Sequence, residues 1–340
     1  MDEPEFSEEG IGLDTATHFV VGIGLAGLAH VDPVVAADST AAFAVFLGTV
    51  AGSQAPDSDG LLRFRGNAAY IRNHRGLSHS LPFLAIWTLL ITFALSLFFP
   101  AVPMAHVLLW VFIAVCLHVF SDLFNTYGTQ AFRPITERWI SWNIIHIFDP
   151  VIFASHLVAI AFWLLGLSHP QLIFPSLYGL LAVYYIWRTV VHYRLESGLS
   201  AKDDKYEAGD RYTLIPTVQL HQWNIVKIRK DGSYALGELR KGTVKWIDDV
   251  HCASHPAVEQ SKSHPNVAAF LYFTSYACAE LKNQPWGYEV RWVDVRYRHR
   301  KQYPFVAVLL LDRNLQPLDS YVGWLSDTRI EKRLRADSQP

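Results

Sequence analysis

Imidazole and carboxylate side chains collect in four short segments of this sequence, each beside an apolar stretch. The segments are Thr17-His18, GSQAPDSDG with Asp57 and Asp59, NHRGLSHS with His74 and His79, and HVFSDLFNTYGTQ with His118 and Asp122. Histidine and aspartate together supply nitrogen and oxygen ligands suited to Zn²⁺, Mn²⁺ or Fe. Such mixed sites are typical of hydrolysis, in which a cation acidifies water and polarises the substrate's oxygen.

The spacing of His118 and Asp122 strengthens this interpretation. They are four residues apart, so on a helix both side chains lie on one face. Ionisable groups deep in apolar segments are costly and by default indicate a functional site. A hydrogen bond between the two that merely joins helices is the structural alternative.

These segments give a specific set of predicted roles. The predicted cation ligands are His18, Asp57, His79, His118 and Asp122. The predicted catalytic residues are Arg75, His74 and Asp59, with the planar donors of Arg75 matched to a phosphoryl group or oxyanion. The residues predicted to orient ligands or substrate are Asn73, Ser78, Ser80, Asn125, Thr129 and Asp149. No thiolate belongs to the set, so a structural zinc site of the cysteine type is not expected. The expected cofactor is a divalent metal, zinc first, with manganese or iron as alternatives.

Six apolar stretches precede residue 195 and must position these groups. They are residues 17–30, 40–54, 81–99, 104–124, 151–167 and 173–191. A membrane span needs about 20 apolar residues. The third, fourth and sixth meet this length, the fifth is marginal, and the first two are short. The sequence therefore predicts an α-helical integral membrane domain with four to six apolar helices.

The basic residues of the loops predict the orientation. Positive charge lies in alternate loops and after the last stretch, at Arg63, Arg65, Arg72, Arg75, Arg133, Arg138, Arg188, Arg194, Lys202 and Lys205. By the positive-inside rule these loops and the C-terminal part face the cytoplasm. Threading the chain in this way brings all four polar segments to the cytoplasmic boundary, where they can form one site.

Composition narrows the classes of function. Only 18% of the 340 residues are charged and the net charge is −2, so a basic nucleic-acid-binding surface is not expected. The N-terminus is acidic and lacks the basic start of a secretory signal. Cys116, Cys252 and Cys278 are far apart and odd in number, so we expect neither a disulfide framework nor a metal pair. A reducing compartment fits this pattern.

The chain changes character near residue 195. LESGLSAKDDKYEAGD is expected to be a polar linker, followed by a hairpin around RKDGS, a helix over NVAAFLYFTSYACAEL, and strands at GYEVRWVDVRYRH and PFVAVLLLD. The predicted organisation is an acidic tail at 1–16, the membrane domain at 17–195 and a small cytoplasmic α+β soluble domain at 196–340.

The motifs THFVVGIGLAGLA, GSQAPDSD, NHRGLSHS, HVFSDLFNTYGTQ and NIIHIFDP together resemble the YdjM-type inner-membrane family of bacteria, and within it the Bacillus YfhP-like members. The resemblance covers residues 14–195 and implies a metal-dependent hydrolase of the bacterial inner membrane, with the lipid bilayer as a partner. The order His, Asp, His, HxxxD is also similar to that of zinc-dependent phospholipase C and related nucleases. Those enzymes hold three zinc ions; this sequence lacks their later ligands, so one or two cations are expected.

The leading hypothesis is a membrane-bound metal-dependent hydrolase acting on a phosphoester, with a phospholipid or other lipid phosphate as a candidate substrate. The alternative is a non-catalytic anchor or regulator that presents the cytosolic domain to a protein partner. A metal transporter would need ligands near the bilayer midplane and is less favoured. GIGLAG at 22–27 lacks the strand of a dinucleotide site, so close helix packing is expected there. The isolated His30, His106, His156 and His169 are expected to be interfacial or packed residues.

Overall fold

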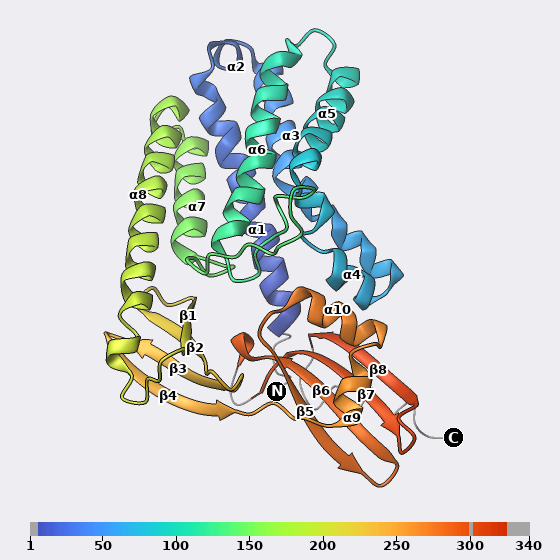
Figure 1. Ribbon diagram of the computed structural model, residues 1–340. Helices are drawn as coiled ribbons and strands as arrows, with labels where there is room; N and C mark the ends of the chain where they lie inside the picture. Colours follow the sequence, from blue (N-terminus) through green and yellow to red (C-terminus); the bar gives the residue numbers. More distant parts are fainter. Residues whose placement is uncertain (1–5, 299–301, 325–340) are drawn as a thin grey trace, which may run out of the picture. The chain divides into compact units, whose positions relative to one another are not determined.

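The computed structural model describes residues 6–298 and 302–324, with side chains from residue 12 onward (Figure 1). Contacts divide the chain into two units. The first, which we call the helical unit, comprises Gly10–Asp59 and His74–Arg194. The second, the sheet unit, comprises the described parts of Met1–Glu9, Gly60–Asn73 and Leu195–Pro340. Residues 60–73 therefore group with the C-terminal part, although they lie between two segments of the helical unit.

All six apolar stretches form helices. The helices of this part of the chain are α1 (Phe6–Leu28), α2 (Pro33–Ala37), α3 (Ser39–Gln54), α5 (Leu81–Phe98), α6 (Met104–Phe124), α7 (Pro150–Leu164) and α8 (Pro170–Ser197). Short 3-10 turns complete it at η1 (Ala29–Val31), η2 (Ala55–Arg65) and η3 (Leu77–His79). Aspartates begin three helices, because Asp32, Asp38 and Asp149 accept hydrogen bonds from the first free backbone N–H groups. Helix α1 begins inside the segment expected to be an acidic tail.

Three helices of the described chain are long and apolar enough to cross a membrane, at Gly12–Val31, Leu81–Phe98 and Met104–Phe124. Pro150–Leu164 is apolar but shorter. Helix α8, which contains the sixth stretch, has 28 residues but is not among the three. Its second half carries tyrosine, tryptophan and arginine side chains, which lower its hydropathy. The first stretch, expected to be short, is instead part of a candidate span.

The glycines of GIGLAG allow α1 to pack closely, as expected. A side chain at Gly22 would clash with Ser53 of α3, and one at Gly27 would clash with the ring of Phe174 in α8. Helices α3, α5 and α6 share one apolar core. Helices α6, α7 and α8 share another apolar core, which is built around Phe124, Ile144, Phe174 and neighbouring residues.

The sheet unit contains two antiparallel sheets with simple up-and-down order (Figure 1). The first consists of β1 (Arg211–Pro216), β2 (Gln222–Ile228), β3 (Tyr234–Arg240) and β4 (Thr243–Val250). The second consists of β5 (Ala277–Gln284), β6 (Gly287–Asp294), β7 (Phe305–Asp312) and β8 (Pro317–Trp324). Helices α4 (Asn67–Asn73), α9 (Pro256–Ser261) and α10 (Pro265–Phe273), with the turns η4 (Ser200–Lys202) and η5 (Val295–Tyr297), complete the unit. The expected α+β architecture and the hairpin around RKDGS are confirmed.

The second sheet is covered on both faces. Val293 and Val306 join one core with Val226 and Leu236 of the first sheet. On the other face the ring of Phe305 lies 4.9 Å from that of Phe270 in α10. This explains why β7 is apolar at nearly every position. Two details differ from the sequence prediction: α10 ends at Phe273 and residues 277–284 form a strand, and β8 was not predicted.

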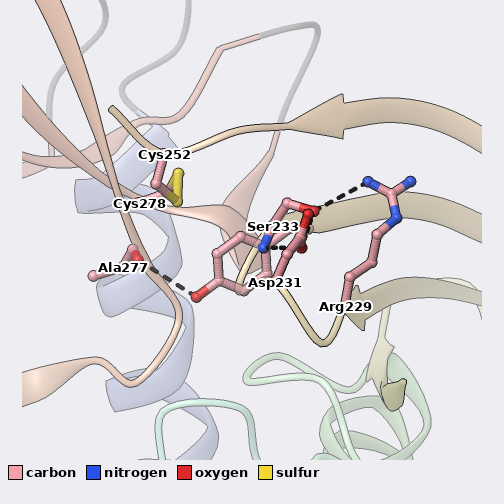
Figure 2. Close-up of a disulfide and its surroundings, with 7 residues drawn as sticks. Arg229, Asp231, Ser233, Cys252, Ala277 and Cys278 are labelled. Atoms are coloured by element: carbon pink, nitrogen blue, oxygen red, sulfur yellow. Dashed lines mark hydrogen bonds between the residues drawn. A yellow bond between two sulfur atoms is a disulfide. The ribbon is translucent and has the colours of Figure 1, made fainter. Parts of the chain in front are cut away.

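The expectation that no disulfide forms was wrong. Cys252 and Cys278 are bonded (Figure 2). Cys116 in α6 is a free thiol. Cys252 follows the last strand of the first sheet and Cys278 lies in the first strand of the second, so the bond connects the two sheets. The cysteines are 26 residues apart, and the spacing alone gave no sign of their pairing. Nearby, the hydroxyl of Tyr234 donates to the carbonyl oxygen of Ala277 at 3.4 Å.

Candidate metal centre

The helical unit brings three of the four polar segments to one point. Asp57, His79, His118 and Asp122 each offer one ligand atom, and these atoms all lie within 4.8 Å of one another. They come from the turn η2, the turn η3 and the helix α6. Of these side chains, His79, His118 and Asp122 are almost fully buried. We call these four residues the His/Asp cluster.

The distances within the His/Asp cluster match the edges of a tetrahedron. Nε2 of His79 lies 3.3 Å from Nε2 of His118, 3.5 Å from Oδ1 of Asp57 and 3.2 Å from Oδ2 of Asp122. Nε2 of His118 lies 3.6 Å and 3.5 Å from the same two oxygens. In a tetrahedral zinc site with bonds of about 2.0–2.2 Å, neighbouring ligand atoms are about 3.3–3.6 Å apart. These five distances fit those between the ligand atoms of a tetrahedral zinc site.

Hydrogen bonds on the far sides of the rings fix which nitrogens carry lone pairs. Nδ1 of His118 lies 2.7 Å from the carbonyl oxygen of Ser53, which can only accept, so this nitrogen donates. The hydroxyl of Ser78 donates to Asp59 and therefore accepts from Nδ1 of His79, at 2.9 Å. In the neutral imidazoles both Nε2 atoms then carry lone pairs that point at each other. Such an arrangement suits a shared cation, and the partners of the outer nitrogens orient metal-binding rings in this way.

Two carboxylate oxygens support the same interpretation. Oδ1 of Asp57 and Oδ2 of Asp122 are buried and have no hydrogen-bond partner among the described residues. A buried polar atom without a partner costs free energy unless a ligand satisfies it. Both oxygens are the ones that face the two Nε2 atoms, so one ion would satisfy all four groups.

The segment NHRGLSHS is organised by Asp59. Its carboxylate accepts from the backbone N–H of Arg75 at 2.8 Å, from Ser78 at 2.7 Å and from Nδ1 of His74 at 2.8 Å. Arg75 has a φ of 55°, so the chain turns sharply after His74. Asp59 thereby holds the loop that presents His79.

Asp14 was missed in the sequence. Nη2 of Arg75 lies 2.5 Å from Oδ2 of Asp14 and 3.3 Å from Oδ1 of Asp122. Nε2 of His18 lies 3.5 Å from Asp14 and 3.5 Å from Asp122. Asp14, His18 and Asp122 form a second group that could hold an ion. The signal was present, because Asp14 and His18 are four residues apart like His118 and Asp122, but Asp14 lay in the segment assigned to the tail.

The guanidinium of Arg75 already supplies a positive charge to this second group. Its contacts are with Asp14 and Asp122, and the role of Arg75 as a clamp for a phosphoryl group or oxyanion stays a prediction. Because Asp122 uses Oδ2 toward the His/Asp cluster and Oδ1 toward Arg75 and His18, this carboxylate connects the two groups. His18 lies beside the cluster, with its ring stacked on His118 at 3.8 Å.

Six residues were predicted to orient the site, and Ser78 bonds to His79 and Asp59 as described above. The other five fall into two sets. Asn125 donates to Asp122 at 3.2 Å, and Thr129 donates to the carbonyl oxygen of Arg75 at 2.9 Å. Ser80 donates to the carbonyl oxygen of Leu77 and stabilises the loop. The other two have local partners: Asn73 is exposed and donates to the carbonyl oxygen of Ala69, and Asp149 caps α7 and accepts from Tyr184.

Neighbouring charges shift the pKa values of three site residues that lie outside the candidate spans. Burial alone would raise the pKa of Asp57, but the imidazoles of His118 and His79 hold it well below its usual range. Burial likewise opposes ionisation of Asp59, whose pKa is lowered chiefly by His74. Burial lowers the pKa of His79, yet Asp122 and Asp57 more than offset this and raise it to about 9. Without a cation a proton neutralises the carboxylates, so proton and cation compete for one lone pair.

The helices, the buried His/Asp groups and the C-terminal sheets define a membrane protein with a site that could hold metal. The chain belongs to the YdjM inner membrane protein family, which matches residues 13–195. Residues 256–334 match the YfhP C-terminal alpha/beta plait domain, which includes α9, α10 and the second sheet. The uncharacterized protein YfhP of Bacillus subtilis (strain 168) is 41% identical over 331 residues, which cover 96% of this chain and 100% of that protein. No solved structure matches.

Proposed function

We propose that this protein is a metal-dependent hydrolase of the bacterial inner membrane that acts on a phosphoester at the cytoplasmic face. The observation that carries the proposal is the convergence of four lone-pair-bearing atoms at tetrahedral spacing inside the helical unit. Two imidazoles and two carboxylates without a thiolate favour zinc, with manganese or iron as alternatives. A bound cation would supply an acidified water and a positive charge at the substrate's oxygen.

Asp59 and His74 supply a proton acceptor in this proposal. Nδ1 of His74 donates to Asp59, which fixes the orientation of the ring. His74 is more exposed than the cluster, with 18% of its side chain accessible. Water can therefore reach the ring of His74, whereas the imidazoles of His79 and His118 are buried.

Arg75 supplies the electrostatic preference for a phosphoester. Its guanidinium lies between Asp14 and Asp122 and is almost fully buried. A fixed positive charge beside the cluster stabilises negative charge that develops on a phosphoryl group. In this role Arg75 positions Asp122 and contributes to the field.

The test compares metal content and hydrolysis in full-length protein purified in detergent. We expect about one zinc per chain in the wild type, and loss of both zinc and hydrolysis of bis(p-nitrophenyl) phosphate in Asp122→Asn and His79→Gln. The matched control is His106→Gln. His106 pairs with Asp32 at 2.6 Å but does not belong to the cluster.

Two outcomes would contradict the proposal. Wild-type protein that binds no transition metal would remove the metal centre. Zinc that is bound normally in Asp122→Asn and His79→Gln would remove the assigned ligands. In either case a non-catalytic anchor that presents the C-terminal domain to a protein partner becomes the better hypothesis.

A further inference from the structure

Helix α5 turns its polar side chains inward. Its buried residues in the described chain are Thr88 and Thr92, which are four residues apart and so lie on one face. Phe93 and Leu97 lie elsewhere on the helix and are exposed. A helix in water has the opposite arrangement, with its apolar face in the core. The exposed surface of α5, which is one of the three candidate spans, is therefore suited to face lipid.

A turn from the connection between α6 and α7 is hydrogen-bonded to the beginning of α5. The backbone N–H of Leu81 donates to the carbonyl oxygen of Ala131 at 2.9 Å. The backbone N–H of Ile135 closes the turn on the carbonyl oxygen of Phe132 at 2.8 Å. All four residues belong to the helical unit. The structure therefore places residues 132–135 at one end of the exposed surface of α5.

Large apolar side chains are exposed around this hydrogen bond. They are Leu77, Leu81, Phe132 and Ile135, and 79% of Ile135 is accessible. We call these four residues the apolar patch. Single exposed apolar residues are common, but a group of them marks a surface that another phase or molecule covers. The patch is continuous with the exposed surface of α5 through Leu81, so lipid is the phase that reaches it.

The polar residues of the same segment fit the boundary of a bilayer. Arg138 is exposed, and Trp139 follows it. Arg133 pairs with Glu137 at 3.1 Å, and 72% of the glutamate side chain is accessible, so this pair contributes little in water. Arginine and tryptophan beside a membrane span lie at the level of the lipid headgroups, where the cations attract anionic lipids.

We propose that residues 131–138 lie in the headgroup layer of an anionic phospholipid bilayer, with the apolar patch below the phosphates and Arg133 and Arg138 beside them. The segment is then a membrane contact instead of a loop in water. Leu77 is two residues before His79, so the contact also holds the loop NHRGLSHS at the surface of the bilayer. The inference requires no bound cation and does not depend on the proposed hydrolysis.

The experiment measures the depth of a nitroxide label on the full chain in nanodiscs of phosphatidylcholine and phosphatidylglycerol. The background is Cys116→Ala, so that the introduced cysteine is the one that reacts. Ile135→Cys is compared with Leu89→Cys in α5 and with Leu318→Cys in β8. Leu318 is also exposed and apolar, but it belongs to the sheet unit and is followed by Asp319. Power saturation with oxygen, which enters lipid, and with a nickel chelate, which stays in water, gives the depth.

We expect the label at residue 135 to be about tenfold less accessible to the nickel chelate than the label at residue 318, because a polar complex is excluded from apolar surroundings. It should lie at a shallower depth than the label at residue 89. Equal nickel accessibility at residues 135 and 318 would place the segment in water and overturn the proposal. Protection of residue 135 from both oxygen and nickel would mean that protein covers the patch, which would overturn the proposal as well.

The same label tests the two arginines. With wild-type arginines, residue 135 should be less accessible to nickel when phosphatidylglycerol is present than in phosphatidylcholine alone. Replacing both, as Arg133→Gln with Arg138→Gln, removes cations that each favour an anionic surface by about fivefold, so this difference should disappear. The control is Arg313→Gln, an exposed arginine of the sheet unit, which should change nothing. A double variant that behaves like the control would overturn the assignment of the arginines to the phosphates.

Discussion

The two units bury charged side chains in opposite ways. In the sheet unit Lys227 of β2 is almost fully buried, and its ammonium donates to Asp203 at 2.7 Å, Asp210 at 2.8 Å and the carbonyl oxygen of Lys205 at 2.7 Å. An ammonium has three donors, and here each has an acceptor. In the helical unit one carboxylate oxygen each of Asp57 and Asp122 in the His/Asp cluster is buried without a hydrogen-bond partner among the described residues.

This difference distinguishes structural burial from a ligand site. A buried charge whose hydrogen bonds are complete needs nothing further, so Lys227 and its two carboxylates serve the fold. Lone pairs that converge in a buried space repel one another unless a proton or a metal cation lies between them. The state of the hydrogen bonds, rather than the degree of burial, thus identifies the candidate centre.

The largest expected effect is on the stability of the sheet unit, where Lys227 is buried with complete hydrogen bonds. Lys227→Met leaves Asp203 and Asp210 buried without their counter-charge, which should destabilise the sheet unit by about 3–5 kcal/mol. Hydrogen exchange of peptides from β2 and β3, measured by mass spectrometry on the full chain, reports this loss. The metal content should not change. The control is Lys262→Met, whose pair with Glu259 is exposed and should contribute less than about 1 kcal/mol. Equal exchange in the two variants would show that the complete hydrogen bonds do not stabilise the fold.

The next largest expected effect is the loss of stability in the sheet unit when the disulfide is removed. Reduction of Cys252–Cys278, or Cys278→Ala, removes a cross-link that closes a loop of 26 residues, and we expect a loss of about 3 kcal/mol in the sheet unit. Exchange of β5 and β6 with and without reductant measures it, and Cys116→Ala is the control because Cys116 is a free thiol. An unchanged exchange rate after reduction would show that the bond does not constrain the sheets.

The same bond also tests the predicted orientation. Disulfides persist in oxidising compartments, whereas the arginines of the loops predict that the C-terminal part faces the cytoplasm. In cells quenched with an alkylating agent, the orientation prediction requires reduced thiols at both positions. A Cys252–Cys278 bond recovered from such cells would overturn the cytoplasmic assignment.

A smaller effect is expected on the zinc affinity of the His/Asp cluster in the helical unit. Ser78→Ala removes the acceptor that keeps the proton of His79 on Nδ1, so the lone pair on Nε2 is less well directed. Loss of such an outer partner typically weakens metal binding by about 10–100-fold. Competition with a zinc chelator measures the affinity. Ser80→Ala, in the same loop, removes only a bond to the carbonyl oxygen of Leu77 and should leave the zinc affinity unchanged. Equal affinities in both variants would separate Ser78 from the site.

Much of the site could be predicted from sequence because its residues follow local rules. The spacing of His118 and Asp122 places both on one face of α6, as the helix requires. The threading of the helices predicted that distant polar segments meet, and Asp57 and His79 do lie beside that face. The sequence analysis placed Asp57 among the ligands and Asp59 among the catalytic residues. The hydrogen bonds by which Asp59 holds the loop NHRGLSHS could not be predicted, because they depend on how that loop folds back on η2.

The features that sequence analysis missed depend on long-range pairing. Asp203 and Asp210 lie in a segment that is polar in composition, and only the position of β2 shows that Lys227 buries them. Composition likewise gave no sign that Cys252 and Cys278 meet across two sheets. Polar segments between elements were assigned to linkers and tails, and each of the missed charges came from such a segment.

The smallest expected effect is a dependence of the sheet unit on acid. Burial alone would raise the pKa of Asp203 and Asp210, but hydrogen bonds from Lys227 and its charge lower both below their usual range. A carboxylate with a folded pKa below its unfolded value stabilises the fold above the unfolded pKa, and this contribution is lost as the pH falls through the folded pKa. Pepsin cleavage between residues 203 and 240 should therefore increase from pH 4 to pH 2. In Asp203→Asn this increase should be smaller, since one of the two titrating groups is gone. A steeper increase in that variant would mean that the pair with Lys227 does not set the acid limit of this unit.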